Sequence, residues 1–411
     1  MKKIILYVVL ATILFSCSTK EKNKIAFEQW RGINRDGIYQ EKDLLKTWTE
    51  GGPELLWFSE NLGEGYGSPI ITDSTIYILA SRDSISVAVA FDLKGNVKWQ
   101  KDFGKEWNTS YPGTRSTPTL INELLYVSSG MGDISCMNSE NGEIIWTKNM
   151  LKDFHGKAPY FGYAQSLLIN DSIVYAMPGG ADTNIIALNR YNGDIIWISK
   201  AKGENPAYNS PKLIDIGGNQ ILVTYSKENF IGIDAKTGSL LWSESFIAKY
   251  PNHANTVLYE DSAIFTAAPI GHGLLKYKLS DDGSEITKIW HDTIIGNYFG
   301  GMIKLADKIY TGAGGRSKNL VMLNANTGEI KDSLVTGNGS IIYADEMLYT
   351  YAHKNGKVCL IDPETFEIKG SFKVKKGTKE HFSHPVIKNG VLYIRHGNAL
   401  LAYDIKDKKL V

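Results

Sequence analysis

The sequence predicts an all-β fold: an eight-bladed β-propeller of four-stranded antiparallel blades, closed by the N-terminal strand around Trp57 in the last blade. Three observations predict it. One motif recurs along the chain, its tryptophans are spaced by the length of one blade, and the number of expected inner strands is eight. Between the motifs, apolar and polar residues alternate with the period of a strand and not with that of a helix.

The recurring motif has Asp or Asn at the start of a turn, Gly near its end and Trp on the strand that follows. The Asp or Asn side chain can accept backbone N–H groups, and Gly supplies the positive φ that a hairpin with a bulge needs. Trp at a fixed register can then pack between adjacent blades. The clearest copies are 137–146, 188–197 and 233–242, with a shorter copy at 91–99. Segments 323–331 and 361–369 keep the turn but lose the Trp, and Phe366 replaces the Gly of the second.

The blade length follows from the tryptophan spacing. The expected blade-docking residues are Trp57, Trp99, Trp146, Trp197, Trp242 and Trp290, separated by 42, 47, 51, 45 and 48 residues. Blades of four strands take roughly 40–50 residues each. The expected inner strands begin near residues 68, 117, 165, 210, 255, 301, 340 and 384. The last unit has no outer strand of its own, so we expect segment 53–62 to complete it and to seal the ring.

The N-terminus is typical of an export signal. Lys2 and Lys3 precede an apolar run that is too short to span a bilayer comfortably, and the run ends at Cys17. It resembles a bacterial lipobox, in which the Cys is lipidated, although Phe15 departs from the usual small residue. A plain cleaved signal or an N-terminal anchor is the alternative. The expected domains are 1–16 (lipoprotein signal peptide), 17–29 (polar tether), 30–53 (N-terminal arm) and 54–411 (propeller).

Composition excludes some partners. The 411 residues carry a formal net charge of +1, which gives no electrostatic reason to expect nucleic acid binding or adhesion to an acidic membrane surface. Cys136 and Cys359 occupy strand-like apolar positions in blades that are not neighbours, so we expect two small buried residues and neither a disulfide nor a metal pair.

The repeats resemble the quinoprotein-type propeller repeat, in which an Ala-x-Asp-x-x-Thr-Gly-x-x-x-Trp stretch docks neighbouring blades. Residues 232–242 are the nearest copy, and the resemblance covers about residues 54–405. Residues 29–37 look like the Trp-x-x-Arg-Gly-type opening of secreted members of this superfamily. We expect Trp30 and Trp48 to plug or cap the ring, within an arm whose role is structural.

Two relatives frame the function. Quinoprotein dehydrogenases hold pyrroloquinoline quinone (PQQ) in the propeller funnel with Ca²⁺, and typically carry an adjacent Cys-Cys pair that this chain lacks. The propeller lipoprotein of the outer-membrane β-barrel assembly machine is a scaffold, and this chain is similar to it in size, anchoring and lack of large insertions. The resemblance therefore favours a scaffold or binding module in the cell envelope, anchored by lipid at the outer membrane, over an enzyme. We expect no catalytic residue, no metal and no cofactor; PQQ with Ca²⁺ belongs to the alternative, a PQQ-dependent dehydrogenase.

Function on a propeller usually lies in the loops of one face. Aromatic, amide and cationic side chains precede the expected inner strands and could bind sugars, quinones or extended peptides. The candidate binding residues are Tyr66, Tyr111, Arg115, Tyr163, Tyr208, Asn209, His253, Asn297, Tyr298 and His381. The histidines lack metal-site spacing, so we expect solvated loop residues. The predicted partner of this monomeric ring is an envelope protein or a small-molecule or glycan ligand, with membrane contact only through the lipid.

Overall fold

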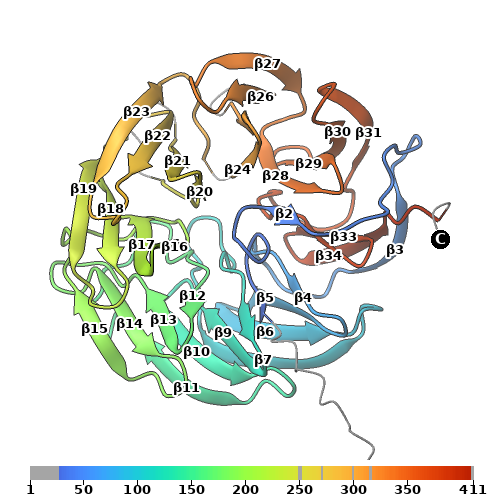
Figure 1. Ribbon diagram of the computed structural model, residues 1–411. Coiled ribbons are helices and arrows are strands. Elements are labelled where there is room, and N and C mark those ends of the chain that lie inside the picture. The colour runs from blue at the N-terminus through green and yellow to red at the C-terminus, as the bar shows by residue number, and fades with distance from the viewer. Residues whose placement is uncertain (1–26, 249–251, 270–271, 299, 314–316, 409–411) are drawn as a thin grey trace, which may run out of the picture.

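The structure is a computed structural model that describes residues 27–248, 252–269, 272–298, 300–313 and 317–408. The expected signal peptide, Cys17 and most of the expected tether lie outside the described residues. The described chain forms eight sheets arranged radially about one axis, and its elements are all strands (Figure 1). No helix long and apolar enough to cross a membrane occurs in this part of the chain.

Each sheet is one blade, and its strands follow in chain order from the axis outward, except where β1, β2 and β3 of the N-terminal segment join a blade from elsewhere in the chain. Blade 1 contains β4 (Ile70–Ile71), β5 (Ile76–Arg82), β6 (Ile85–Phe91) and β7 (Val97–Lys105). Blade 2 contains β8 (Thr119–Ile121), β9 (Leu124–Ser128), β10 (Asp133–Asn138) and β11 (Ile144–Asn149). Blade 3 contains β12 (Leu168–Asn170), β13 (Ile173–Ala176), β14 (Ile185–Asn189) and β15 (Ile195–Ser199). Blade 4 contains β16 (Lys212–Ile216), β17 (Asn219–Tyr225), β18 (Asn229–Asp234) and β19 (Leu240–Ser245).

The second half of the ring repeats this order. Blade 5 contains β20 (Leu258–Glu260), β21 (Ala263–Ala267), β22 (Leu274–Leu279) and β23 (Ile286–Asp292). Blade 6 contains β24 (Met302–Leu305), β25 (Lys308–Gly312), β26 (Asn319–Asn324) and β27 (Ile330–Val335). Blade 7 contains β28 (Gly339–Ala344), β29 (Met347–Ala352), β30 (Lys357–Asp362) and β31 (Glu367–Lys373). Blade 8 contains β32 (Val386–Lys388), β33 (Val391–His396), β34 (Ala399–Asp404) and, from the other end of the chain, β3 (Glu54–Ser59).

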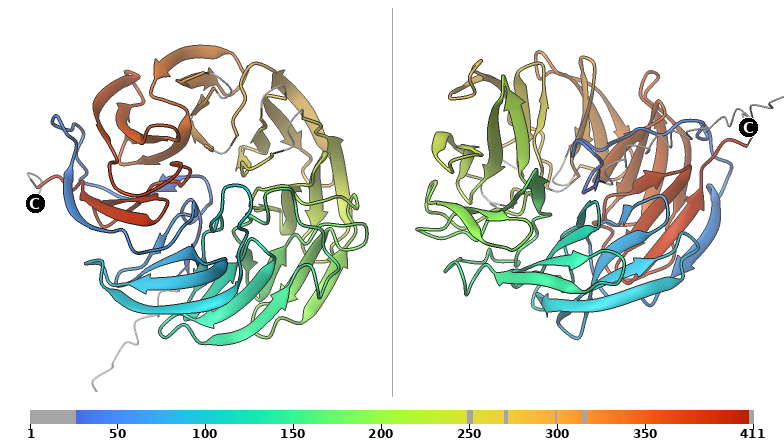
Figure 2. Two further views of the ribbon diagram at one scale, coloured as in Figure 1. Left: turned by 180° about the vertical axis from the view of Figure 1, so that it is seen from behind. Right: turned by 60° about the horizontal axis from the view of Figure 1, so that its bottom comes forward.

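The predicted ring and its closure are confirmed. β3 pairs antiparallel with β34, with Trp57 opposite Ala402. Both views of Figure 2 place the blue N-terminal strand against the red C-terminal ones. The blades differ from the prediction in one respect. The arm adds a fifth, inner strand to two of them, because β1 (Phe27–Glu28) pairs antiparallel with β8 and β2 (Ile38–Tyr39) pairs parallel with β28.

The predicted docking role of the tryptophans has a geometric basis. Each indole Nε1–H donates to a backbone carbonyl in the Asp/Asn–Gly turn of the following blade. The six bonds are Trp57 to Leu93 (2.9 Å), Trp99 to Ser139 (3.0 Å), Trp146 to Arg190 (2.8 Å), Trp197 to Ala235 (3.1 Å), Trp242 to Gly283 (3.2 Å) and Trp290 to Ala325 (3.1 Å). The turn requires Gly for two reasons, as Gly238 shows. Its φ of +78° is a conformation that Gly adopts without strain, and a Cβ at this position would lie 2.6 Å from Trp197 Cε3 and so block the indole.

The two blades without a docking Trp fill its place in different ways. In blade 6, Asp332 stands at the Trp register, and Phe366 in the turn of blade 7 supplies a ring instead. Tyr310 packs on Phe366 at 5.9 Å between centroids and donates its hydroxyl to Pro363 O at 2.9 Å. Blade 6 has no Trp at this interface, and the Phe366 ring, which stands in place of the turn Gly of blade 7, occupies the space instead.

In blade 7, Gly370 stands at the Trp register, and Trp48 of the arm lies against it. A Cβ on Gly370 would lie 2.6 Å from Trp48 Cβ, and Trp48 packs against Tyr349 at 5.9 Å and Phe372 at 5.5 Å between centroids. The expectation that Trp48 plugs or caps the ring is therefore wrong. Trp48 fills the interface between blades 7 and 8, because the chain passes there on its way from the axis to β3.

A second belt of contacts joins neighbouring inner strands close to the axis. It uses hydroxyl and amide side chains that precede these strands, together with one backbone pair. The bonds are Ser68 N to Thr117 Oγ1 (3.0 Å), Thr117 N to Ser166 Oγ (2.9 Å), Ser166 N to Ser210 Oγ (2.9 Å), Thr256 Oγ1 to Ser210 O (2.6 Å), Gly301 N to Asn255 Oδ1 (2.9 Å), Ile341 N to Gly300 O (3.1 Å), Ser340 Oγ to Ser383 O (2.9 Å) and Ser68 Oγ to His384 O (2.8 Å). The blades are thus tied at the axis and at the rim.

At the interface of blades 6 and 7, Asp332 and Phe366 stand where the other interfaces have Trp and Gly. A double-mutant cycle tests whether this exchange of the Trp–Gly pair is compensatory. Phe366→Gly is expected to lower the free energy of unfolding by about 2 kcal/mol, because it removes a buried ring and leaves a gap. Asp332→Trp combined with Phe366→Gly restores the Trp–Gly pair of the other blades, and should recover most of this loss. Urea unfolding measures both. Equal stabilities of the single Gly variant and the double variant would contradict the exchange.

Candidate functional site: an aromatic cup closed by the arm

The N-terminal arm fills the axial channel from one face of the ring. β1 runs antiparallel to the inner strand of blade 2 and β2 runs parallel to that of blade 7, so the chain enters the ring, turns and leaves by the same face. Arg31 and Arg35 lie at the turn and are buried. We call the opposite face the mouth face, since the loops from each outer strand to the next inner strand lie there.

Arg35 joins the arm to blades 3 and 4. Its guanidinium donates to Ser166 O (3.2 Å), Pro211 O (3.1 Å) and Leu167 O, and its Nε–H donates to Gln29 Oε1 at 2.6 Å. Burial lowers the pKa of Arg35 to about 9, which leaves it protonated at neutral pH.

Arg31 joins the same arm to the other side of the ring. It donates to Met302 O (2.9 Å) and Ile341 O (3.0 Å), and to His384 Nδ1 at 2.9 Å. Because a guanidinium can only donate, Nδ1 of His384 is the acceptor and its proton is on Nε2. Trp30 packs edge-on against His384, with 5.4 Å between centroids.

Above this plug lies a cavity of about 320 Å³, which we call the cup. Trp30 and His384 belong to its floor, and the loops before the inner strands form its wall. The lining residues are Trp30, Tyr66, Gly67, Ser68, Tyr111, Arg115, Phe161, Ala164, Ser166, Tyr208, Ser210, Asn252, Ala254, Tyr298, Phe382 and His384. Among the described residues that line it, Arg115 is the one formal charge and no carboxylate occurs.

Five rings form a continuous row along one side of the cup, which we call the collar. The distances between ring centroids are 5.3 Å for Tyr66–Phe382, 5.9 Å for Phe382–Tyr111, 6.1 Å for Tyr111–Phe161 and 5.9 Å for Phe161–Tyr208. The rings are tilted by 42° to 69° relative to their neighbours. Together they present a concave apolar surface that belongs to blades 8, 1, 2, 3 and 4.

Of the ten residues predicted for binding, five line the cup: Tyr66, Tyr111, Arg115, Tyr208 and Tyr298. The structure places the other five outside the lining, in contacts within and between blades. The Tyr163 hydroxyl donates to Pro178 O (2.7 Å), Asn209 Nδ2 to Thr224 Oγ1 (3.0 Å) and Asn297 Nδ2 to Thr311 Oγ1 (2.7 Å), while His381 Nδ1 bonds the Tyr351 hydroxyl (2.5 Å) and His253 stacks on Tyr225 (5.2 Å between centroids).

The expectation of solvated histidines is also corrected. His253, His381, His384 and His396 are buried, and His381 stacks on His396 with 3.7 Å between centroids. No three His, Cys, Asp or Glu side chains gather as metal ligands in the described part of the chain. Cys136 and Cys359 are free and buried, as predicted.

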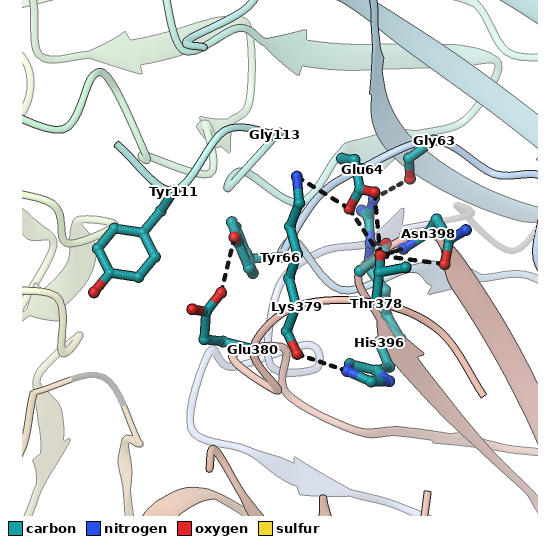
Figure 3. Close-up of polar contacts among 12 residues, drawn as sticks. Gly63, Glu64, Tyr66, Tyr111, Gly113, Thr378, Lys379, Glu380, His396 and Asn398 are labelled. Atoms are coloured by element: carbon teal, nitrogen blue, oxygen red, sulfur yellow. Dashed lines mark hydrogen bonds and ion pairs between the residues drawn. The ribbon is translucent and has the colours of Figure 1, made fainter. Parts of the chain in front are cut away.

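The expected site lacked several lining residues. Phe382 and His384 follow the long loop after β31, and Trp30 comes from the arm. The sequence predicts that Trp30 plugs or caps the ring, but the contact of Trp30 with the cup depends on the path of the arm, which no repeat in the sequence reveals. Figure 3 shows the blade 8 side of the cup: Tyr66 donates to Glu380 at 3.2 Å, and Lys379 pairs with Glu64 at 3.4 Å.

The ring and its Trp–turn repeat define a β-propeller of the PQQ-like repeat class. Residues 85–331, more than half of the chain, match the family model described as outer membrane protein assembly factor BamB, and the chain belongs to this family.

Individual relatives are distant. Outer membrane protein assembly factor BamB of Moranella endobia is 25% identical over 257 residues, which is 60% of each protein. Tetrathionate hydrolase of Acidithiobacillus ferrooxidans is 22% identical over 295 residues, 62% of this chain and 56% of the hydrolase. The matches thus span less than two thirds of these relatives. Among solved structures, BamB from Moraxella catarrhalis has a TM-score of 0.60 at 13% identity, covering 85% of this chain and 98% of BamB.

A quinohemoprotein alcohol dehydrogenase from Comamonas testosteroni shares the fold, with a TM-score of 0.70 at 12% identity, covering 92% of this chain and 80% of the enzyme. The cup can be compared with the needs of a quinone and its Ca²⁺. Aromatic rings and Arg115 suit a flat anion, but Ca²⁺ takes six to eight oxygen ligands, commonly with carboxylates. The described lining supplies no carboxylate, so it does not fit the metal.

The arginine that holds the arm gives one prediction. Arg35→Met leaves Gln29 Oε1 and three buried carbonyls without a donor, and should lower the free energy of unfolding by about 3 kcal/mol. The arm should also become accessible to proteases between residues 30 and 53. Urea unfolding and limited proteolysis measure these effects, with the exposed Lys94→Met as control. Unchanged cleavage in Arg35→Met would show that the arginine does not hold the arm.

A buried histidine gives a second prediction. Burial, with His272 nearby, lowers the pKa of His253 to about 4 from an ordinary value of 6.5. The unfolded chain therefore binds a proton between these pH values that the folded chain does not, and stability is lost as the pH falls from 6.5 to 4. At pH 4 this loss lowers the free energy of unfolding of the wild type by an amount on the order of 3 kcal/mol. His253→Phe keeps the ring stacking and should abolish this pH-dependent loss. Parallel stability–pH profiles of wild type and variant would refute the assignment.

Proposed function

We propose that this chain is a binding module of the cell envelope that holds an extended segment of another envelope protein at its mouth face. The observation that carries this proposal is the apolar mouth. Large apolar side chains that are strongly exposed lie on the mouth loops around the cup: Ile294 (80%), Tyr160 (77%), Ile247 (65%) and Tyr111 (48%). Exposed apolar surface beside a concave site is typical of protein interaction sites.

Two further considerations support it. The family to which the chain belongs is named for an assembly factor of outer membrane proteins. The blades are fixed at the rim and at the axis, so the mouth loops stand on a rigid support. We also propose that residues 1–16 are a signal peptide, that Cys17 is lipidated at the outer membrane, and that 17–29, 30–53 and 54–411 are tether, arm and propeller.

Site-specific photo-crosslinking in native envelopes tests the proposal. A photoreactive amino acid at Tyr160 or Ile294 should crosslink one envelope protein, and the same group at the exposed Glu140, on the opposite face, should not. The captured protein, once purified, should bind wild type at least tenfold tighter than a Tyr160→Ser/Ile294→Ser variant, since two exposed anchors are lost. Equal crosslinking from both faces, or none from the mouth, would overturn the proposal.

The dehydrogenase-like alternative has its own outcome in the same preparation. Addition of PQQ and Ca²⁺ should produce no dye reduction with alcohols or sugars, because the described lining offers Ca²⁺ no carboxylate. Substrate-dependent dye reduction that is lost in Trp30→Ala would replace the binding module with an enzyme.

A further inference from the structure

The described arm closes the cup on the side away from the mouth. Arg31 and Arg35 fill the channel beneath Trp30 with a guanidinium network bonded to the inner strands. Whatever enters through the mouth must leave through it, so a polypeptide cannot thread the ring. With about 320 Å³, the cup is at the small end of ligand pockets, which run to roughly 300–1,000 Å³. It has room for the end of a chain and not for a folded element.

The charge of Arg115 in the cup determines which end of a polypeptide chain, the amino or the carboxyl terminus, could bind there. Arg115 donates from Nη2 to Ser110 O (3.0 Å) and Tyr111 O (2.6 Å), and from Nη1 to Gly113 O (3.3 Å). These bonds fix the guanidinium and use three of its five N–H donors. The Nε–H and one Nη1–H have no acceptor among the described residues, and Arg115 forms no ion pair with them. A fixed cation with donors to spare attracts a carboxylate and repels an ammonium group.

The carboxylates near Arg115 have partners of their own. Glu106 is buried and accepts from Ser86 Oγ (2.7 Å), Trp107 N (2.8 Å) and Gly130 N (2.9 Å). Glu380 accepts from the Tyr66 hydroxyl (Figure 3). It is not part of the described lining of the cup. Neither of them forms an ion pair with Arg115 at 4.0 Å or less in the described chain.

The collar selects the side chain beside the carboxylate. Tyr66, Tyr111 and Tyr208 line the same cup as Arg115, and Phe161 and Phe382 complete the apolar wall. A large apolar or aromatic side chain would pack against tilted faces and edges, the arrangement that aromatic pairs prefer. An internal acidic residue would bring two chain segments through the mouth and bury unpaired peptide groups. A terminal residue brings only one segment.

We propose that the cup binds the C-terminal residue of the extended segment held at the mouth, with its α-carboxylate on Arg115 and a large apolar or aromatic side chain within the collar. This inference rests on the proposed function and adds the chemistry of the partner. Capture of a terminal carboxylate is a known mode of peptide recognition, and here it would combine with an apolar rim for the preceding residues. Glu380, at the edge of the cup, would oppose the anion.

Matched peptides test the inference on the full wild-type chain. An acetylated hexapeptide that ends in Phe with a free carboxylate should bind roughly tenfold or more tightly than the same peptide with a C-terminal amide, because a charge-assisted bond is lost. Titration calorimetry measures both. Equal affinities would overturn the inference and leave the proposed function standing, whereas loss of mouth crosslinking would overturn the proposed function itself.

Variants assign the preference to Arg115. Arg115→Gln should abolish the preference for the acid, Arg115→Lys should retain part of it, and Glu380→Gln should strengthen binding of the acid two- to fivefold without affecting the amide. Glu140→Gln, on the opposite face, is the matched control and should change neither. Thermal unfolding identifies any variant whose loop has collapsed; the acid–amide comparison on wild type does not depend on these variants. Binding of free glucuronate with no binding of either peptide would assign the cup to acidic sugars and overturn the inference.

Discussion

The indole N–H that reaches from one blade to a carbonyl of the next is the contact on which the ring depends. A blade has no covalent reason to stand at a given angle to its neighbour, and face-to-face packing of sheets permits some sliding. A directional hydrogen bond at the rim removes that freedom, because its donor and acceptor lie on different blades. The turn Gly leaves room for the indole at one place only. Where the Trp is absent, Phe366 and Trp48 occupy the same interface from the opposite blade and from the arm. Each of these interfaces therefore still contains an aromatic side chain of suitable size between the two blades.

The arm has a comparable role at the axis. Arg35 bonds carbonyls of blades 3 and 4, and Arg31 bonds those of blades 6 and 7 and His384 of blade 8. A segment of a few residues therefore connects blades on opposite sides of the ring. Such buried guanidinium groups are stable only while their donors are satisfied, so the arm and the inner strands stabilise one another. The floor of the cup inherits this rigidity through Trp30.

The fold was predictable from the sequence because its repeat is a local pattern with a physical cause. The turn, the Gly and the Trp are all visible within ten residues, and their period gives the blade length. The closure by β3 followed from the missing outer strand. The role of Trp48 was not predictable, because it fills a vacancy in a distant blade and matches no repeat. For the cup, residue type before each inner strand was informative for Tyr66, Tyr111 and Arg115. It failed for Asn209 and Asn297, because amides at the same positions serve the bonds between strands.

The direction in which the arm enters also orients the molecule relative to its proposed anchor. Phe27 pairs with Ile121 at the end of β8 that lies away from the mouth, so the described chain begins on the face opposite the cup. The chain between Cys17 and Phe27 spans at most about 35 Å even when fully extended. With lipid on Cys17, the plugged face would lie toward the bilayer and the cup would open away from it. A partner would then be met from the aqueous side, at a height above the membrane set by the thickness of the ring and the length of this tether.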